Sequence, residues 1–219
     1  MNMGEMYRAG RIGMIELGRS LSDDQAAMRV PACPLWSIKD VYAHQAGVVD
    51  DALAGRLDGV TTDPWTALQV EKRKDNPLGK VLDEWESIVE PFEAFLETGA
   101  APPQVIIDQW SHEQDIRAAL DRPGNRDDER ATFCVKALAE FRLESWKHTP
   151  YEVIGDSGSW RFGTGEPQIT LRACDYDLAR ALLGRRSRAQ VEAMDWTGDP
   201  TPILDHFVVF AYSDEDQPA

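Results

Sequence analysis

The chain has 219 residues, a formal net charge of −15 and 42% hydrophobic residues, which is typical of a globular protein with a substantial core. The excess of acidic residues argues against nucleic acid as a partner, because phosphate binding depends on clustered Lys and Arg. No apolar run approaches the roughly 18 residues that a membrane helix needs, so we expect no membrane partner.

The three cysteines, Cys33, Cys134 and Cys174, are far apart in the sequence and form no CxxC pair. This pattern indicates reduced thiols, and it predicts neither a disulfide framework nor a cysteine zinc site. The first residues also lack the uninterrupted apolar core of a signal peptide. We therefore expect a cytoplasmic protein.

In chain order, helical spacing predicts a first helix over residues 5–20. The next segment, VPACPLW, contains two prolines and is predicted to be a loop, because proline cannot continue a helix. Ser37 is followed three residues later by Asp40, a pattern that resembles a capping box. This pair predicts the start of a second helix that runs to about residue 55.

Further helices are predicted along the next hundred residues. A short helix follows Pro64, and a longer one spans about 77–96, where Pro91 predicts a kink or a break. Another helix opens near Pro103, and the last of this group covers 130–148. Four long helices and a shorter one with short connections favour an antiparallel four-helix bundle.

From residue 151 the sequence changes character. Short alternating segments divided by Gly and Asp predict two or three antiparallel strands, and a helix is expected over 175–184. The sequence thus predicts an α+β protein, with an N-terminal antiparallel four-helix bundle at 1–150 and a small α+β domain at 151–219. So short a second domain would be marginally stable alone, and we expect it to pack on the bundle.

The helix that opens near Pro103 carries an unusual polar pair. With 3.6 residues per turn, Asp108 and His112 fall on one stripe among Val105, Ile116 and Ala119. Burying a carboxylate on such a stripe is costly unless the charge is paired, and a bound metal ion would supply the pairing.

His44 is the candidate for a third ligand, because it lies in a similar apolar setting on the second helix. Two His and one carboxylate leave one coordination position open, as catalytic zinc sites do, although the same set suits iron, nickel or manganese. Asp115 would orient a ligand histidine or form a surface ion pair. Without a metal, Asp108 and His112 would form an ordinary hydrogen bond within the helix, and spacing alone leaves both interpretations open.

Three segments resemble one known family. The segment ACPLWSIKDVYAHQAG is similar to the first signature of the mycothiol-dependent maleylpyruvate isomerase family. This family is a branch of the DinB-like four-helix metal proteins. Its second signature resembles DQWSHEQDIRAALDRPG, and a segment of its smaller C-terminal domain resembles YDLARALLGRRSRAQV. The resemblance covers nearly the whole chain and departs from the family at Asp108, where the usual residue is Glu.

The resemblance implies a divalent metal, zinc in most of the family, held by His44, Asp108 and His112. A low-molecular-weight thiol, mycothiol, would bind at the open metal position and lose its proton. The thiolate would add to the cis double bond of a small unsaturated acid, and rotation followed by elimination would give the trans isomer. Arg185 or Arg186 would hold the carboxylates and the developing negative charge of the substrate.

Two other functions stay open. Other DinB-like proteins are S-transferases, which conjugate mycothiol to electrophiles for detoxification with the same metal and thiolate. Alternatively, the metal site is degenerate and the chain is a non-catalytic small-molecule-binding protein. The presence of both His44 and His112 favours an enzyme, whereas Asp108 in place of Glu favours the binding protein.

Overall fold

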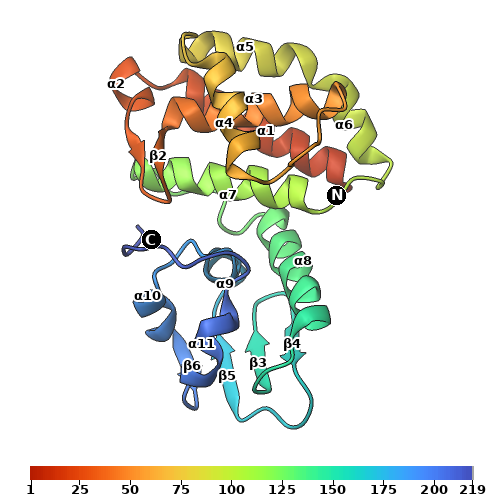
Figure 1. Cartoon of the computed structure of the whole chain (residues 1–219), viewed down its shortest axis with the longest axis vertical. Helices are drawn as coiled ribbons and strands as arrows, with labels where there is room; N and C mark the ends of the chain where they lie inside the picture. Colours follow the sequence, from red (N-terminus) through yellow and green to blue (C-terminus); the bar gives the residue numbers. More distant parts are fainter. Residues whose placement is uncertain (219) are drawn as a thin grey trace. The chain divides into compact units, whose positions relative to one another are not determined.

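The computed structural model describes residues 1–218, which form two compact units, one over Met1–Gly124 and one that begins at Asn125 (Figure 1). The boundary expected at residue 150 lies one helix later. Helix α8 (Glu129–Ser145) contacts α9 (Asp175–Leu182) and β4 (Ser159–Phe162), so it packs with the sheet. The combination of helices and sheet confirms the α+β class.

The first unit consists mainly of the helices α1 (Met3–Arg19), α2 (Asp23–Ala26), α3 (Ile38–Leu53), α4 (Asp63–Arg73), α5 (Leu78–Ile88), α6 (Glu90–Glu97) and α7 (Gln104–Ala119). Helix α1 contacts α5, α6 and α7, and α3 contacts α4, α5 and α7, so the helices surround a shared core (Figure 1). The antiparallel four-helix bundle stays a prediction. Among the described residues, no helix has both the length and the apolar character needed to cross a membrane.

Two local predictions about helix ends are confirmed. Ser37 caps α3: its hydroxyl accepts from the Asp40 N–H at 3.2 Å, and the Asp40 carboxylate accepts from the Ser37 N–H at 2.9 Å. The predicted long helix over 77–96 is broken, since α5 ends at Ile88 and α6 begins at Glu90 with Pro91 in its first turn. Proline is accommodated there because the first turn leaves its N–H groups without helical partners.

The segment predicted to be a loop instead contains a small hairpin. Strands β1 (Arg29–Val30) and β2 (Cys33–Ser37) pair antiparallel, with an irregular register. Such short edge strands tolerate proline, which explains why Pro34 does not prevent pairing. Strand β1 contacts α7 and β2 contacts α3, so the hairpin lies against both helices (Figure 1).

The sheet of the second unit has four strands in the order β4-β3-β5-β6, which corrects the prediction of two or three antiparallel strands. Strand β3 (Tyr151–Ile154) pairs antiparallel with β4 but parallel with β5 (Ile169–Arg172), because the chain reverses twice and β5 then pairs on the other side of β3. The edge strand β6 (Asp195–Thr197) was not predicted. The remaining helices are α10 (Arg188–Glu192) and α11 (Thr201–Phe207).

Helix α7 is unusual because it buries polar side chains in the first unit. Nine of its residues are buried, and six of these are polar or charged. Burying polar groups costs free energy that hydrogen bonds only partly offset, so such a concentration on one helix points to a functional role. The six are Gln109, Ser111, His112, Glu113, Gln114 and Asp115.

Helices α3 and α4 approach closely at Gly47. A Cβ atom at this position would lie 2.4 Å from Cβ of Gln69, far inside van der Waals contact. Gly47→Ala should therefore lower the free energy of unfolding by about 1–3 kcal/mol, measured by chemical denaturation. Gly79→Ala on α5 is the matched control, because no atom lies within 4 Å of its added Cβ. Equal stability losses in the two variants would contradict the close helix contact.

Candidate metal centre

The structure brings His44, Asp108 and His112 together. His44 extends from α3, and the other two extend from α7, one turn apart. One ligand atom from each lies within 4.8 Å of the others. Oδ1 of Asp108 is 3.3 Å from Nε2 of His44 and 3.5 Å from Nε2 of His112. The carboxylate therefore lies between the two imidazoles, as i, i+4 spacing on α7 allows.

The hydrogen bonds behind His44 fix its tautomer. The side-chain amide nitrogen of Gln69 donates to Asp51 at 2.8 Å, so the amide oxygen faces Nδ1 of His44, at 2.7 Å. An amide oxygen can only accept, and Nδ1 must carry the proton. In the neutral ring Nε2 then directs a lone pair toward Asp108, and in the protonated ring Nε2–H donates to it. Asp51 is itself held by Arg56, whose Nε donates to it at 2.8 Å.

Asp115 has the same position behind His112. Its Oδ2 lies 3.3 Å from Nδ1 of His112, and its side chain is fully buried. A carboxylate at this place favours the proton on Nδ1 and leaves Nε2 directed at Asp108, the arrangement typical of metal-ligating histidines. This placement agrees with the orienting role considered for Asp115 in the sequence analysis.

Three acceptor atoms therefore converge on one point. Lone pairs on two neutral imidazoles and a carboxylate repel one another unless a proton or a metal cation lies between them. The N–O distances of 3.3 and 3.5 Å are longer than a good hydrogen bond. They are close to the separation of roughly 3.4 Å expected between two ligand atoms that both bind one tetrahedral zinc ion at about 2.0–2.1 Å. The donor set thus fits a divalent metal.

Electrostatics at the centre also favour a cation. Desolvation raises the pKa of the Asp108 carboxyl, but the charges of His44 and His112 and hydrogen bonds from His44 and Gln45 outweigh it, so the net pKa lies well below the ordinary value. Burial lowers the pKa of His44, but Asp108 and the bond to Gln69 overcome it and raise the net pKa. In both cases the site stabilises a positive charge next to an ionised carboxylate.

Aromatic side chains enclose the histidines and leave the carboxylate accessible. The ring centroid of Trp36 is 5.1 Å from that of His44 and 5.8 Å from that of His112, and Trp65 contacts the edge of His44. The exposed fractions of the His44 and His112 side chains are 3% and 7%, whereas that of Asp108 is 36%. A small ligand could approach the centre from the Asp108 side.

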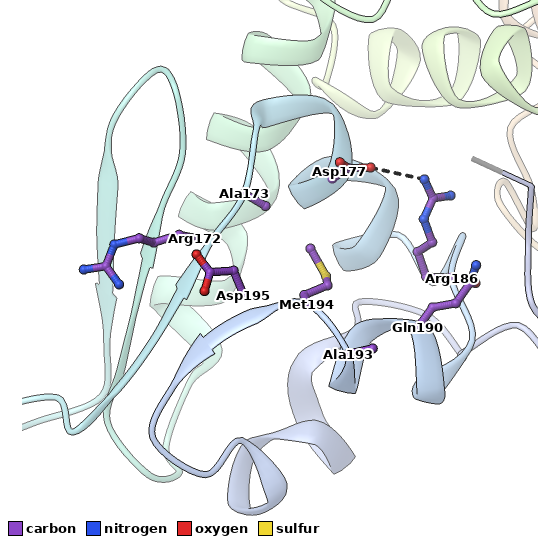
Figure 2. A pocket seen from close by; sticks show the side chains of 8 residues that line it. All are labelled: Arg172, Ala173, Asp177, Arg186, Gln190, Ala193, Met194 and Asp195. Carbon is purple, nitrogen blue, oxygen red and sulfur yellow. Dashed lines mark hydrogen bonds and ion pairs between the residues drawn. The ribbon is translucent and has the colours of Figure 1, made fainter.

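Arg185 and Arg186, the predicted catalytic cations, belong to the second unit. The Arg186 guanidinium is buried and donates to Asp177 at 3.2 Å and to the backbone oxygen of Arg185 at 2.9 Å. Figure 2 shows Arg186 beside a pocket of about 510 Å³ that also has Arg172 in its lining. Their role at the metal centre stays a prediction.

Sequence reasoning missed three residues around the centre. Gln45 donates to Oδ2 of Asp108 at 2.7 Å, Gln69 holds His44, and Cys33 lies 4.0 Å from Nδ1 of His112. Gln45 follows His44 directly, and Cys33 is part of the segment ACPLWSIKDVYAHQAG that resembles the family. The sequence positions of both therefore pointed to the centre. The position of Gln69 did not, because its contact depends on how α4 packs on α3.

Comparison with known proteins identifies the family. The model of the mycothiol maleylpyruvate isomerase N-terminal domain matches residues 7–122, more than half of the chain. The chain belongs to this family. The matched range contains His44, Asp108 and His112, and the resemblance in the sequence is confirmed. No curated protein matches the chain.

A solved structure has a similar fold. It is the crystal structure of an alanine mutant of the mycothiol-dependent maleylpyruvate isomerase, with a TM-score of 0.55 and 8% sequence identity. The match covers 84% of this chain and 88% of that chain. At this identity the likeness supports the fold, whereas the activity has to be argued from the residues.

Gln69 should influence metal binding through His44. Gln69→Met removes the acceptor for the Nδ1 proton and keeps an unbranched side chain of similar length, so zinc affinity should fall about 10-fold or more. Competition with a chromophoric chelator measures this affinity. Gln104→Met, at the exposed start of α7, is the matched control and should bind zinc like the unaltered chain. Unchanged affinity in Gln69→Met would show that the bond does not orient a ligand.

Proposed function

We propose that the chain is a metal- and thiol-dependent isomerase of the maleylpyruvate isomerase type, with His44, Asp108 and His112 as zinc ligands and mycothiol as cosubstrate. The observation that carries the proposal is the convergence of two imidazole lone pairs and one carboxylate on a partly accessible point. Membership of the family supplies the reaction type.

The ligand residues differ in what they contribute. His44 and His112 are neutral, directional donors held from behind by Gln69 and Asp115. Asp108 supplies the negative charge, and its second oxygen is held by Gln45. Three protein ligands leave a fourth tetrahedral position for a small molecule. A divalent ion bound here would act as a Lewis acid that lowers the pKa of a thiol bound at that position.

The surroundings of the centre suit a small acid and a thiol. Trp36 covers the two histidines and keeps water from their rings, so a ligand reaches the site on the Asp108 side. A substrate with carboxylates needs a cation as well, and we propose Arg185 or Arg186 for this role. An arginine binds a carboxylate with two parallel hydrogen bonds, which fixes the substrate better than a lysine would.

The S-transferase function remains the second candidate. It would use the same ligands, with an electrophile in place of the unsaturated acid. The apolar wall formed by Trp36 and Trp65 favours this reading, because detoxification substrates are commonly apolar. The non-catalytic binding protein is the third candidate. Among the described residues Cys33, Cys134 and Cys174 form no disulfide, and we propose a reducing compartment such as the cytoplasm.

The activity is tested directly with mycothiol and maleylpyruvate. The zinc-loaded chain should convert the cis acid to the trans isomer only when mycothiol is present. The change in substrate absorbance measures this conversion. His44→Ala should lose zinc, measured by elemental analysis, together with the activity. A stable conjugate of mycothiol with an added electrophile, without isomerisation, would favour the S-transferase. Tight zinc binding with neither reaction would favour the binding protein.

The length of the Asp108 side chain is a second test. Its Oδ1 already lies at the distance from Nε2 of both histidines that is expected for ligands of one zinc ion. The extra methylene in Asp108→Glu should displace the carboxylate and weaken zinc binding about 10-fold. Asp23→Glu on the surface of α2 is the control and should leave the affinity unchanged. Tighter binding in Asp108→Glu would instead mean that aspartate is too short at this position.

A further inference from the structure

A second set of possible metal ligands lies on the other side of His112. Sγ of Cys33, on β2, is 4.0 Å from Nδ1 of His112 and 3.8 Å from Oδ2 of Asp115. The same Oδ2 is 3.3 Å from Nδ1 of His112. Sulfur, nitrogen and oxygen thus form a compact triangle, with its ligand atoms within 4.8 Å of one another. His112 belongs to both sets, and it uses a different ring nitrogen in each.

The dimensions of this triangle suit a bound ion better than hydrogen bonds. A thiol is a weak hydrogen-bond donor, and contacts of 3.8 and 4.0 Å stabilise it little. A tetrahedral zinc ion with one sulfur at about 2.3 Å and nitrogen and oxygen at about 2.0–2.1 Å would give edges of roughly 3.4–3.6 Å. Small side-chain adjustments would bring the triangle to these lengths.

We propose that Cys33, His112 through Nδ1, and Asp115 form a second site, for a thiophilic divalent cation such as zinc. The ion takes the place of the His112 Nδ1 proton, and the ring then bridges the two metal positions. When the ion binds, the S–H bond of Cys33 and the Nδ1–H bond of His112 break, and bonds from sulfur and nitrogen to the metal form. The thiol proton passes to solvent. The ring proton passes to solvent when a metal holds Nε2, and it moves to Nε2 when the first site is empty. No oxidant or reductant is needed.

Burial and charge are consistent with this site. Asp115 is fully buried and His112 nearly so, whereas Cys33 is half-buried and gives an ion access from the surface. A thiolate and a carboxylate together balance the two positive charges of the ion, and the negative charge of a bridging His112 ring is shared between the ions of both sites. Thiolate and imidazole are the donors that zinc and softer ions prefer, whereas magnesium and manganese prefer oxygen.

Cobalt substitution tests the second site separately from the first. A thiolate ligand gives Co²⁺ an intense near-ultraviolet charge-transfer band, whereas imidazole and carboxylate ligands alone give only weak visible bands. The experiment titrates the full chain with Co²⁺ under a phosphine reductant, so that no added thiol contributes. We expect the charge-transfer band in the unaltered chain and two equivalents of zinc by elemental analysis.

Cys33→Ser should remove the charge-transfer band and one equivalent of metal while the visible bands persist. Cys174→Ser, which alters an exposed cysteine of the second unit, is the matched control and should keep the band. Cys33→Ala is a second variant in case serine oxygen binds metal, and circular dichroism checks that each variant folds. His44→Ala should keep the charge-transfer band, because it disturbs only the first site.

The possible outcomes separate the two proposals. Bound cobalt without a charge-transfer band, a band that survives in both Cys33 variants, or no bound cobalt would each overturn the second site. A band that disappears in Cys33→Ser together with all visible bands would support the second site and overturn the metal centre of the proposed function.

Discussion

The contact of the Asp108 carboxylate with Nε2 of both His44 and His112 is the constraint around which the first unit is arranged. Three acceptor atoms at these distances repel one another, so each must be held in place from behind. The structure supplies a holding group for each: Gln69 for His44, Asp115 for His112 and Gln45 for Asp108. The polar residues that α7 buries are partly a consequence of this requirement.

The packing of the helices follows from the same requirement. Gln69 reaches His44 only because α4 lies against α3, and Gly47 permits that approach because it has no side chain. The amide is oriented in turn by Asp51 and Arg56. A series of hydrogen bonds therefore runs from the exposed Arg56 to His44. A substitution at Arg56, Asp51 or Gln69 would alter the direction of the His44 lone pair.

Local geometry explains which features could be predicted. The i, i+4 spacing of Asp108 and His112, the capping box at Ser37 and the break at Pro91 each depend on a few neighbouring residues, and the structure agrees with all three. Membership of the family was predictable from the quoted segments. The meeting of His44 with the α7 pair could be expected on two grounds: both lie on apolar stripes, and the resemblance to the family implies them as one ligand set.

Features that depend on tertiary contacts could not be predicted in the same way. The hairpin β1–β2 forms across a proline-containing segment, and the parallel pairing of β3 with β5 depends on the path of the chain after β4. Cys33 was discounted as a ligand because it lacks a nearby cysteine partner in the sequence. The hairpin nevertheless places it beside His112 and Asp115, which are about 80 residues away.

The two nitrogens of His112 connect environments of different chemical character. On the Nε2 side the donors are nitrogen and oxygen, a set that accepts zinc, iron, nickel or manganese with little selectivity. On the Nδ1 side the sulfur of Cys33 favours thiophilic ions. The net charge of −15 raises the local concentration of any cation, so charge alone selects no metal. Selectivity must then come from the donor atoms. Because His112 belongs to both sets, an ion bound at one of its ring nitrogens would change the basicity of the other nitrogen.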